Sequence, residues 1–518
     1  GSGKTMLLQT MMTSLALDHS PAQVHIYVLD FGGRLLKLYE QLPHVGAVLL
    51  PDDEDLIARL FRMVSGTLDT HKTLLADAGI GSFAAYREHV GPENAPPATI
   101  VMIDNVNEFA NAYPDLIDEV TRIAREGGNL GVHVVLTGSS AGSIPMRLAS
   151  NFAIAAALEL TDASDYGSVV GRTNGLTPER GVRGRGLIRD ITPLEFQTCT
   201  PSVGQSDAER LHGVRTLIAE MTSAWDGPVA PPVRRVPSLL PLSDLLSPAP
   251  EWIANGAESL AAPIGVDVET LEPLVVDLRQ DPHQIVTGSP LSGKTTLVQT
   301  WLVALAERYA PDSVQMVIVS MASPLFMPFS RLPHVTALVE DDDRLMEVAE
   351  TLRVEMSNRH AALDAARRTS SGMLVDDEFI ARYPTIVIAI DDFDQFLNLA
   401  NEGSKEILTQ LVRRGRRLGF RFIVASPSRD LSSSWDAVAK ALKEAQTGVL
   451  LGSSDHEDLA HFNLRLPPAE SGKSLPPGRG YVGKRGQLRR IQAASIHAGS
   501  PTLLAWIASI ARKHTGAA

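Results

Sequence analysis

Residues 288–295 read Gly288-Ser289-Pro290-Leu291-Ser292-Gly293-Lys294-Thr295. Two glycines separated by four residues and followed by Lys and Thr match the phosphate-binding loop (P-loop) motif in full. The glycines let backbone N–H groups turn inward around phosphate oxygens at the start of a helix. The motif follows the strand-like stretch Gln284–Thr287 and opens a helix-like stretch from Thr296 to Arg308, as it requires. We expect Lys294 to contact the β- and γ-phosphates of ATP and Thr295 to bind Mg²⁺, with Thr296 beside them.

The chain repeats itself. Gly3-Lys4-Thr5 returns as Gly293-Lys294-Thr295, 290 positions later, and Leu42-Pro43-His44-Val45 returns as Leu332-Pro333-His334-Val335 at the same spacing. Gly184-Arg185-Gly186 likewise matches Gly478-Arg479-Gly480. Shared order and near-constant spacing indicate an internal duplication. Gly1, Ser2, Gly3, Lys4 and Thr5 are therefore the end of a first P-loop, and we expect the chain to be part of a longer protein.

Short β-branched runs alternate with longer helical patterns in both copies. The predicted strands are Val24–Leu29, Thr99–Ile103, Val132–Leu136, Gln284–Thr287, Gln315–Val319, Thr385–Ile390 and Arg421–Ala425. The predicted helices include Asp55–Leu68, Arg344–Ala366 and Lys405–Leu418. This alternation predicts an α/β protein with two tandem P-loop NTPase (RecA-like) domains, each a mostly parallel sheet flanked by helices.

A segment rich in proline and serine separates the copies. It covers residues 228–250, and such a composition favours an extended linker. We therefore expect a first domain at 1–227 and a second at 251–518. The second begins with Ile264–Asp267 and Leu274–Leu278, which we predict to be short strands ahead of the P-loop.

An aspartate ends one buried strand in each copy. Asp104 follows Thr99–Ile103, and Asp391 follows Thr385–Ile390. A P-loop enzyme needs a carboxylate there to hold Mg²⁺, so we assign both to the metal, with Thr5 and Thr295 as the partner ligands. A simple strand cap is the alternative for each aspartate.

The next position differs between the copies. Asn105 follows Asp104, whereas Asp392 follows Asp391. Asn cannot accept a proton from water, so Asn105 marks a degenerate catalytic position, and Asp392 is the candidate base of the second copy. Glu108 and Asp394 are nearby alternatives, although each is typical of a solvated helix start.

Other polar residues complete the candidate sites. Thr137, Ser139, Ser426 and Ser428 follow strands and are candidates for sensing the γ-phosphate, with a serine-rich turn as the alternative. Arg413, Arg416 and Arg125 precede strands and are candidate arginine fingers acting on a neighbouring subunit. An exposed basic helix face is the alternative explanation for these arginines.

Composition narrows the function classes. The chain has 518 residues, 44% of them hydrophobic, with a net charge of −13, which argues against a broad DNA-binding surface. Aromatic residues make up only 5%, so a stacking platform for single strands is not indicated. Cys199 is the only cysteine, which excludes an intrachain disulfide and favours a reducing compartment.

Several segments resemble the FtsK/SpoIIIE-like translocase ATPases. They are Ile264–Asp267, Asp281–His283, Glu355-Met356 with Arg359, Arg416–Gly419, Leu466–Pro468 and Pro477–Tyr481. Two modules in series, with Asn105 at the usual acidic position, look most like the tandem C-terminal ATPase modules of the type VII secretion motors EccC/EssC.

The resemblance implies a motor at the cytoplasmic face of the cell membrane, anchored by an upstream segment and assembled as a homo-hexamer. It implies ATP and Mg²⁺ as cofactors, other membrane subunits as partners, and binding of small helical WXG-type substrates through a C-terminal signal. Both copies lack the Glu that usually follows the metal aspartate, so we expect weak or regulatory hydrolysis. A DNA translocase of the same fold and a non-hydrolysing, ATP-stabilised scaffold are the alternatives.

Overall fold

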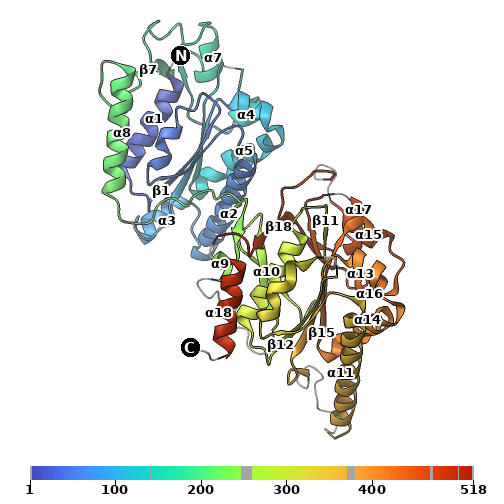
Figure 1. Cartoon of the computed structure of the whole chain (residues 1–518). Coiled ribbons are helices and arrows are strands. Elements are labelled where there is room, and N and C mark those ends of the chain that lie inside the picture. The colour runs from blue at the N-terminus through green and yellow to red at the C-terminus, as the bar shows by residue number, and fades with distance from the viewer. Residues whose placement is uncertain are drawn as a thin grey trace. The chain divides into compact units, whose positions relative to one another are not determined.

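The computed structural model divides into two compact units, Gly1–Arg235 (unit 1) and Val236–Ala518 (unit 2) (Figure 1). It describes residues 3–140, 142–246, 259–321, 323–369, 380–454, 456–466, 471–499 and 501–515. Gly1, Ser2, the end of the proline-rich segment at 247–250, and Pro467-Pro468 lie outside the described residues. Within those described ranges, no helix combines the length and the apolar character that crossing a bilayer requires.

The elements of unit 1 alternate as the sequence predicts. They are α1 (Lys4–Asp18), β1 (Val24–Asp30), η1 (Lys37–Gln41), β2 (Val45–Leu49), α2 (Glu54–Ala78), α3 (Phe83–Val90), β3 (Ala98–Asp104), α4 (Val106–Ala112), η2 (Pro114–Leu116), α5 (Ile117–Glu126), η3 (Gly127–Leu130), β4 (Val132–Leu136), α6 (Met146–Ala149), β5 (Ala156–Leu158), α7 (Asp165–Val170), β6 (Arg185–Ile188), β7 (Leu194–Gln197) and α8 (Asp207–Ser223).

A parallel four-stranded sheet, in the order β2-β1-β3-β4, forms the centre of unit 1. Alternate residues of β1 serve opposite cores: Ile26 and Val28 pack with α1 and α8, and Tyr27 and Leu29 pack with α2, α4 and α5. Burial of both faces explains why residues 26–29 form a continuous apolar run. Strands β5, β6 and β7 form a separate antiparallel sheet.

Unit 2 contains more strands. Its elements are β8 (Leu240–Pro241), α9 (Leu242–Leu246), β9 (Ala261–Asp267), β10 (Pro273–Asp277), β11 (His283–Gly288), α10 (Lys294–Arg308), β12 (Val314–Val319), η5 (Pro324–Arg331), β13 (Val335–Val339), α11 (Asp342–Thr369), β14 (Thr385–Ile390), α13 (Phe393–Leu399), α14 (Glu402–Gly415), η6 (Arg416–Leu418), β15 (Phe420–Pro427), α15 (Ser428–Ser433), α16 (Ala437–Lys443), β16 (Thr447–Leu451), α17 (His456–Leu459), η7 (Ala460–Phe462), β17 (Arg479–Lys484), β18 (Gln487–Ser495) and α18 (Leu503–Thr515).

One sheet of 11 strands runs through unit 2, in the order β10-β9-β18-β17-β16-β11-β15-β14-β12-β13, with β8 beside β18. The pairs from β16 through β11 to β13 are parallel. The pairs from β16 through β17, β18 and β9 to β10 are antiparallel, and β8 is parallel to β18. Strand β11 joins the two halves because it pairs with both β15 and β16. The described residues of unit 1 contain no strand that pairs with both β4 and β5 as β11 pairs with β15 and β16, so unit 1 has two separate sheets.

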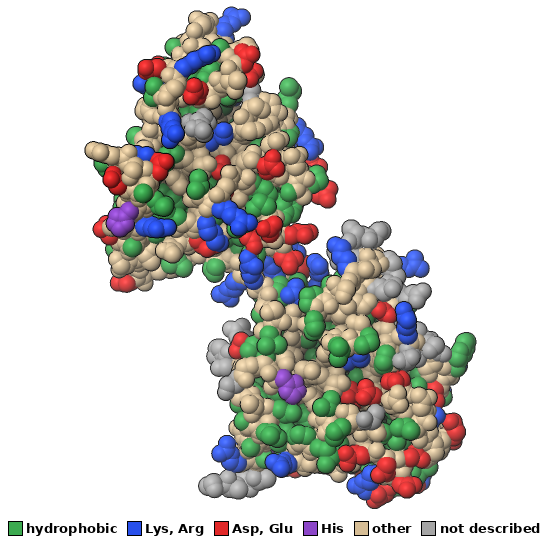
Figure 2. Space-filling model, turned by 45° about the horizontal axis from the view of Figure 1, so that its top comes forward, with side chains coloured by type: hydrophobic (Ala, Val, Ile, Leu, Met, Phe, Trp, Pro, Cys, Tyr) green, Lys and Arg blue, Asp and Glu red, His purple; other side chains and the backbone are tan. Residues whose placement is uncertain are grey.

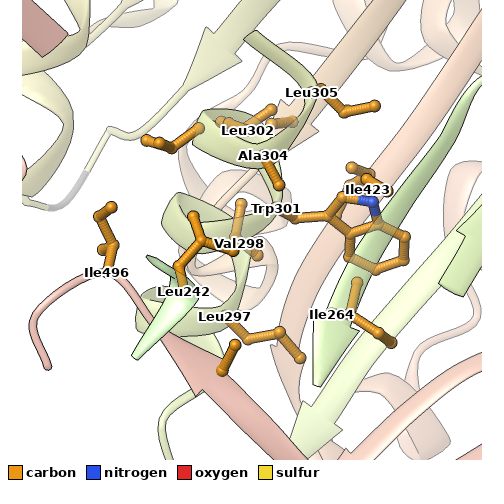
Figure 3. Close-up of a cluster of buried hydrophobic side chains, with 14 of the residues drawn as sticks. Leu242, Ile264, Leu297, Val298, Trp301, Leu302, Ala304, Leu305, Ile423 and Ile496 are labelled. Atoms are coloured by element: carbon orange, nitrogen blue, oxygen red, sulfur yellow. The ribbon is translucent and has the colours of Figure 1, made fainter. Parts of the chain in front are cut away.

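Helix α10 lies deep in unit 2. Every residue from Leu297 to Ala306 is buried, and Trp301 has no exposed surface. Figure 3 shows Trp301 among apolar side chains from several elements, including Leu242, Ile264 and Ile423. The helix that follows the P-loop is therefore held on several sides, so the loop is mounted on a rigid support.

The proline-rich segment is not a free tether along its described length. Ala230 donates its N–H to the Pro43 carbonyl (2.9 Å), and Leu240 pairs with Ala494 in β18. The first part of the segment therefore packs on unit 1, and the second part packs on unit 2.

Candidate functional site

The P-loop of unit 2 connects β11 to α10. Gly288 has φ 149°, and a Cβ there would lie 2.0 Å from the Leu451 carbonyl oxygen, so only glycine fits. Gly293 has φ 101° at the start of α10, and Leu291 has φ 60° at the exposed tip. These left-handed residues turn the loop around the positive end of the helix, which makes a site for an anion.

Lys294 points back along this loop. Its Nζ donates to the carbonyl oxygens of Ser289 (2.9 Å) and Gly288 (3.3 Å). Burial lowers the pKa of Lys294, although the carboxylates of Asp391, Asp392 and Asp394 oppose that effect. The ammonium group is thus close enough to meet a phosphate held by the loop amides.

Thr295 and Asp391 lie together as the sequence predicts. The Thr295 Oγ1 hydroxyl lies 3.0 Å from each carboxylate oxygen of Asp391, which is buried at the end of β14. Burial, followed by the neighbouring Asp392 carboxylate, raises the pKa of Asp391 to about 6. A bound cation would relieve this cost, and a carboxylate with a hydroxyl is an oxygen donor pair suited to Mg²⁺.

Ser292 adds a further observation. Its Oγ is buried and has no hydrogen-bond partner in the described part of the chain. A buried hydroxyl without a partner costs free energy unless a ligand or water satisfies it. The residues of the unit 2 loop therefore fit a phosphate with a divalent cation.

Asp392 and Asn105 occupy the same unusual backbone position. Asp392 has φ 48° and Asn105 has φ 63°, and each precedes the first residue of a helix, α13 or α4. Asn and Asp tolerate this left-handed region better than other non-glycine residues. Burial and Asp394 raise the pKa of Asp392. Of the nearby alternatives, Asp394 is half-buried and Glu108 is exposed.

The unit 1 site repeats this arrangement with one addition. Gly3 has φ 105°, α1 begins at Lys4, and the Thr5 hydroxyl donates to Asp104 Oδ2 (3.0 Å). Thr137 donates to Asp104 Oδ1 (2.5 Å) and accepts the N–H of Asn105 (2.9 Å). Both oxygens of Asp104 are therefore held by the protein. In unit 2 the matching position is Ala425, which has no hydroxyl.

The other predicted polar residues are dispersed. Ser428 contacts Thr287 at the end of β11 (2.9 Å between the hydroxyl oxygens), and Ser426 lies 3.3 Å from the Pro427 carbonyl. Ser139 is exposed. Of the four candidates, Thr137 is the one that the described contacts connect to a metal-site aspartate.

Sequence reasoning missed a second buried carboxylate in unit 1. Asp30 pairs with Asp104 across β1 and β3, and its carboxylate accepts the N–H groups of Gly32, Gly33, Arg34 and Leu36 at 2.9–3.2 Å. A Cβ at Gly32 would lie 2.2 Å from Asp104 Oδ2. The loop after β1 thus packs directly on the metal-site aspartate. An aspartate followed by two glycines near a strand end was the available signal.

The repeated Gly-Arg-Gly stretch also lies at the loops. Gly478, with φ 75°, donates its N–H to the Ser292 carbonyl (2.9 Å). In unit 1, a Cβ at Gly3 would lie 3.3 Å from the backbone of Gly184. The sequence repeat predicted that the two Gly-Arg-Gly stretches correspond to each other. The spacing alone did not predict that each stretch lies against a P-loop.

The candidate arginine fingers do not reach their own P-loops. Arg413 and Arg416 lie at the end of α14 and in η6, and Arg125 lies at the end of α5. These elements precede β15 and β4, so the arginines lie at the amino ends of the strands, opposite the P-loop edge. Arg413 lies 3.9 Å from Glu444, and Arg125 lies 2.8 Å from Glu126. Action of these arginines on a neighbouring copy stays a prediction.

His44 and His334 support matching turns. Their Nε2 atoms lie 2.7 Å from the carbonyl oxygens of His19 and Tyr309, respectively. Across the described ranges, no cluster of three or more His, Cys, Asp or Glu side chains offers a further metal site.

Comparison with known proteins gives a consistent result. EccC of the Thermomonospora curvata ESX secretion system is 29% identical over 95% of this chain and 36% of its own length. EccC of Geobacillus thermodenitrificans is 24% identical over 96% of this chain and 32% of its own length. The chain thus spans about a third of the length of these relatives.

Solved structures match along nearly the whole chain. EssC (ATPases 2 and 3) from Geobacillus thermodenitrificans superposes with a TM-score of 0.81 at 22% identity, covering 96% of this chain and 89% of that one. EccC (ATPases 2 and 3) from Thermomonospora curvata, in complex with a signal sequence peptide, gives 0.65 at 26% identity, covering 95% and 86%. The sequence model of the FtsK/SpoIIIE family matches residues 1–180 and 242–430. Because this match covers most of the chain, once in each unit, the chain belongs to the FtsK/SpoIIIE family.

Proposed function

We propose that this chain supplies two successive ATPase modules of a type VII protein secretion machine. The observation that carries the proposal is the likeness, along 95% of the chain and at 26% identity, to EccC ATPases 2 and 3 in complex with a signal sequence peptide. We place the modules at residues 1–227 and 251–518, with 228–250 as the joining segment.

Each module binds ATP with Mg²⁺ in this proposal. Residues 288–296 and 1–5 hold the phosphates, and the metal ligands are Thr295 with Asp391 and Thr5 with Asp104. Bound Mg²⁺ would neutralise phosphate charge and polarise the γ-phosphoryl group. The protein side chains orient the nucleotide, and Asp392 positions and deprotonates the attacking water in the second module.

Hydrolysis is weak in the first module because Asn105 cannot take a proton. Substituting Asn105→Glu should raise phosphate release if the missing acid limits this site. Asn105→Asp is the matched variant, since Asp392 adopts the same left-handed backbone. Phosphate release in the Lys294→Ala background isolates the first site. No gain in either variant would show that another element, such as an arginine from a neighbouring copy, limits the reaction.

The partners follow from the same proposal. The modules bind the C-terminal signal of small helical WXG-type substrates, and the full protein assembles as a hexamer with other membrane subunits at the cytoplasmic face of the membrane. Arginines such as Arg413, Arg416 and Arg125 act on the neighbouring copy, which fits their distance from their own loops.

The proposal is tested by measuring, separately, the binding of a secreted-substrate signal peptide and the binding of duplex DNA. Fluorescence anisotropy with each labelled probe should show saturable binding of the peptide and none of the DNA at physiological salt. Tight DNA binding without peptide binding would instead make the chain a DNA translocase. Retention of ATP through dialysis with no phosphate release, even with peptide added, would identify a scaffold.

A further inference from the structure

A basic groove lies between α11 and α14 of unit 2, away from the P-loop. Figure 1 shows the two helices beside each other, and their residues are in contact. The groove has a volume of about 630 Å³. Buried Met356 and Leu418 form its apolar floor, and Arg353, Arg368 and Arg414 line it.

The three guanidinium groups are not equally engaged. Arg353 is held by Glu350 (2.8 Å from Nε). Arg368 and Arg414 are exposed, and neither forms an ion pair with any residue in the described part of the chain. On the face that Figure 2 shows, side chains of both charge signs are interspersed. In a chain with a net charge of −13, a groove with guanidinium groups lacking partners is therefore a distinct local feature.

Unit 1 has different side chains at the positions that correspond to this groove, although its helices match. His71 contacts the Leu130 carbonyl in unit 1 (2.7 Å), as Arg359 contacts the Leu418 carbonyl in unit 2 (3.0 Å). Arg359 lies 288 positions after His71, and Leu418 lies 288 positions after Leu130. With the same offset, the unit 1 residues that correspond to Arg353, Arg368 and Arg414 are Ser65, Ile80 and Glu126. Packing is thus shared by both copies. The corresponding region of unit 1 holds the guanidinium of Arg122, which lies 2.8 Å from Ser65 and pairs with Glu119 (2.7 Å), whereas the exposed guanidinium groups of Arg368 and Arg414 are found in unit 2.

We propose that this groove binds an acidic peptide segment of a partner protein. Guanidinium forks pair with carboxylates through two parallel hydrogen bonds, and the apolar floor accepts an aliphatic side chain between them. Gln410 and Ser357 supply hydrogen-bonding groups for a peptide backbone. Asp364, which pairs with Arg367 (3.5 Å), also lines the groove and repels any anion beside it. A peptide can place an uncharged residue next to Asp364, whereas nucleic acid carries a phosphate at every nucleotide, so the groove favours a peptide.

The test uses the full chain and a short fluorescein-labelled peptide of glutamates interrupted by leucines. Anisotropy should show saturable binding that weakens as salt increases. Arg368→Ser with Arg414→Ser should weaken binding about tenfold, because two charge pairs are lost. Asp364→Asn should strengthen it about threefold by removing a like charge. The matched control is Arg331→Ser, an exposed arginine at the end of η5 that should leave the affinity unchanged.

Charge reversal guards against an indirect effect on folding. Arg368→Glu with Arg414→Glu should lose the glutamate peptide and gain a lysine version of it, which a misfolded protein would not do. Unchanged affinity in the double Ser variant overturns the proposal. So does a duplex oligonucleotide or tripolyphosphate that displaces the peptide and binds more tightly through the same arginines. Binding of the secreted-substrate signal peptide is measured in the same double Ser variant. Unchanged binding of the signal peptide there would show that the proposed function uses a different site from this groove.

Discussion

Among single residues of the P-loop, we expect Lys294 to contribute most to nucleotide affinity. Its Nζ lies 2.9 Å from the Ser289 carbonyl, within the loop that would surround the phosphates. Lys294→Ala should lower the affinity of unit 2 for Mg·ATP at least about a hundredfold, since charge-assisted hydrogen bonds are lost. Isothermal titration calorimetry should still detect any nucleotide bound by unit 1. Lys4→Ala is the reciprocal variant, and full affinity in Lys294→Ala would refute the site assignment.

Asp391 should make unit 2 less stable as pH rises. Its pKa is about 6 in the folded protein against an ordinary value of 3.8, so between these values the folded state holds a proton that the unfolded state has lost. The unfolding free energy therefore falls from about pH 4 to pH 6 and then levels off. Asp391→Asn avoids this loss and should stabilise metal-free unit 2 at pH 7.5 by of the order of 3 kcal/mol.

Thermal melts at several pH values measure this effect. The gain should vanish at pH 4, where the wild-type carboxyl is protonated in the folded state. A gain of equal size at pH 4 and pH 7.5 would mean that burial of the charge is not its cause.

Residue identity alone did not reveal every contact at the sites. Gly-Lys-Thr and the strand-terminal aspartates were predictable because their spacing is fixed by the chemistry of phosphate binding. The hydrogen bond from Thr137 to Asp104 was not predictable, because it joins residues that β3 and β4 bring together across 33 positions of sequence. The left-handed backbone at Asn105 was likewise hidden, since Asn occurs in many other conformations.

At the scale of elements, Arg359 stabilises the packing of α11 against the segments before β14 and β15 in unit 2. Its buried guanidinium donates to the Pro384 and Leu418 carbonyls (3.0 Å each) and to Glu355 (2.7 Å). Arg359→Ala leaves two carbonyls without partners and should cost about 3–5 kcal/mol. Arg359→His should recover part of this, since His71 makes the matching contact in unit 1. Urea unfolding measures both, and equal losses in the two variants would contradict a bracing role.

The parallel strands were predictable as elements because each is a buried β-branched run. Predicted Thr385–Ile390 and Val132–Leu136 are β14 and β4 without change. Strands β5–β7 and β16–β18 were not predicted. Strands β5–β7 have three or four residues, and β16 and β17 contain glycines. Strand β18 is longer, but its first half is polar, so local periodicity does not reveal its pairing.

At the scale of the whole molecule, two sets of hydrophobic clusters indicate two folding units. Each described cluster draws its residues from one unit only. A chain of residues 236–518 should therefore fold alone and retain Mg·ATP binding that depends on Lys294. Circular dichroism and calorimetry of this fragment provide the measurement. A fragment that stays unfolded, or folds without binding nucleotide, would show that the units depend on each other.

Strand β4 has an open edge whose consequence reaches beyond the nucleotide site. In the described residues β4 pairs with β3 alone, so every second amide and carbonyl along its other side lacks a strand partner. In unit 2 the matching strand β15 pairs at this edge with β11, which leads into the P-loop. A strand supplied at the β4 edge, from the same protein or from another chain, should slow the exchange of the β4 amide hydrogens with solvent.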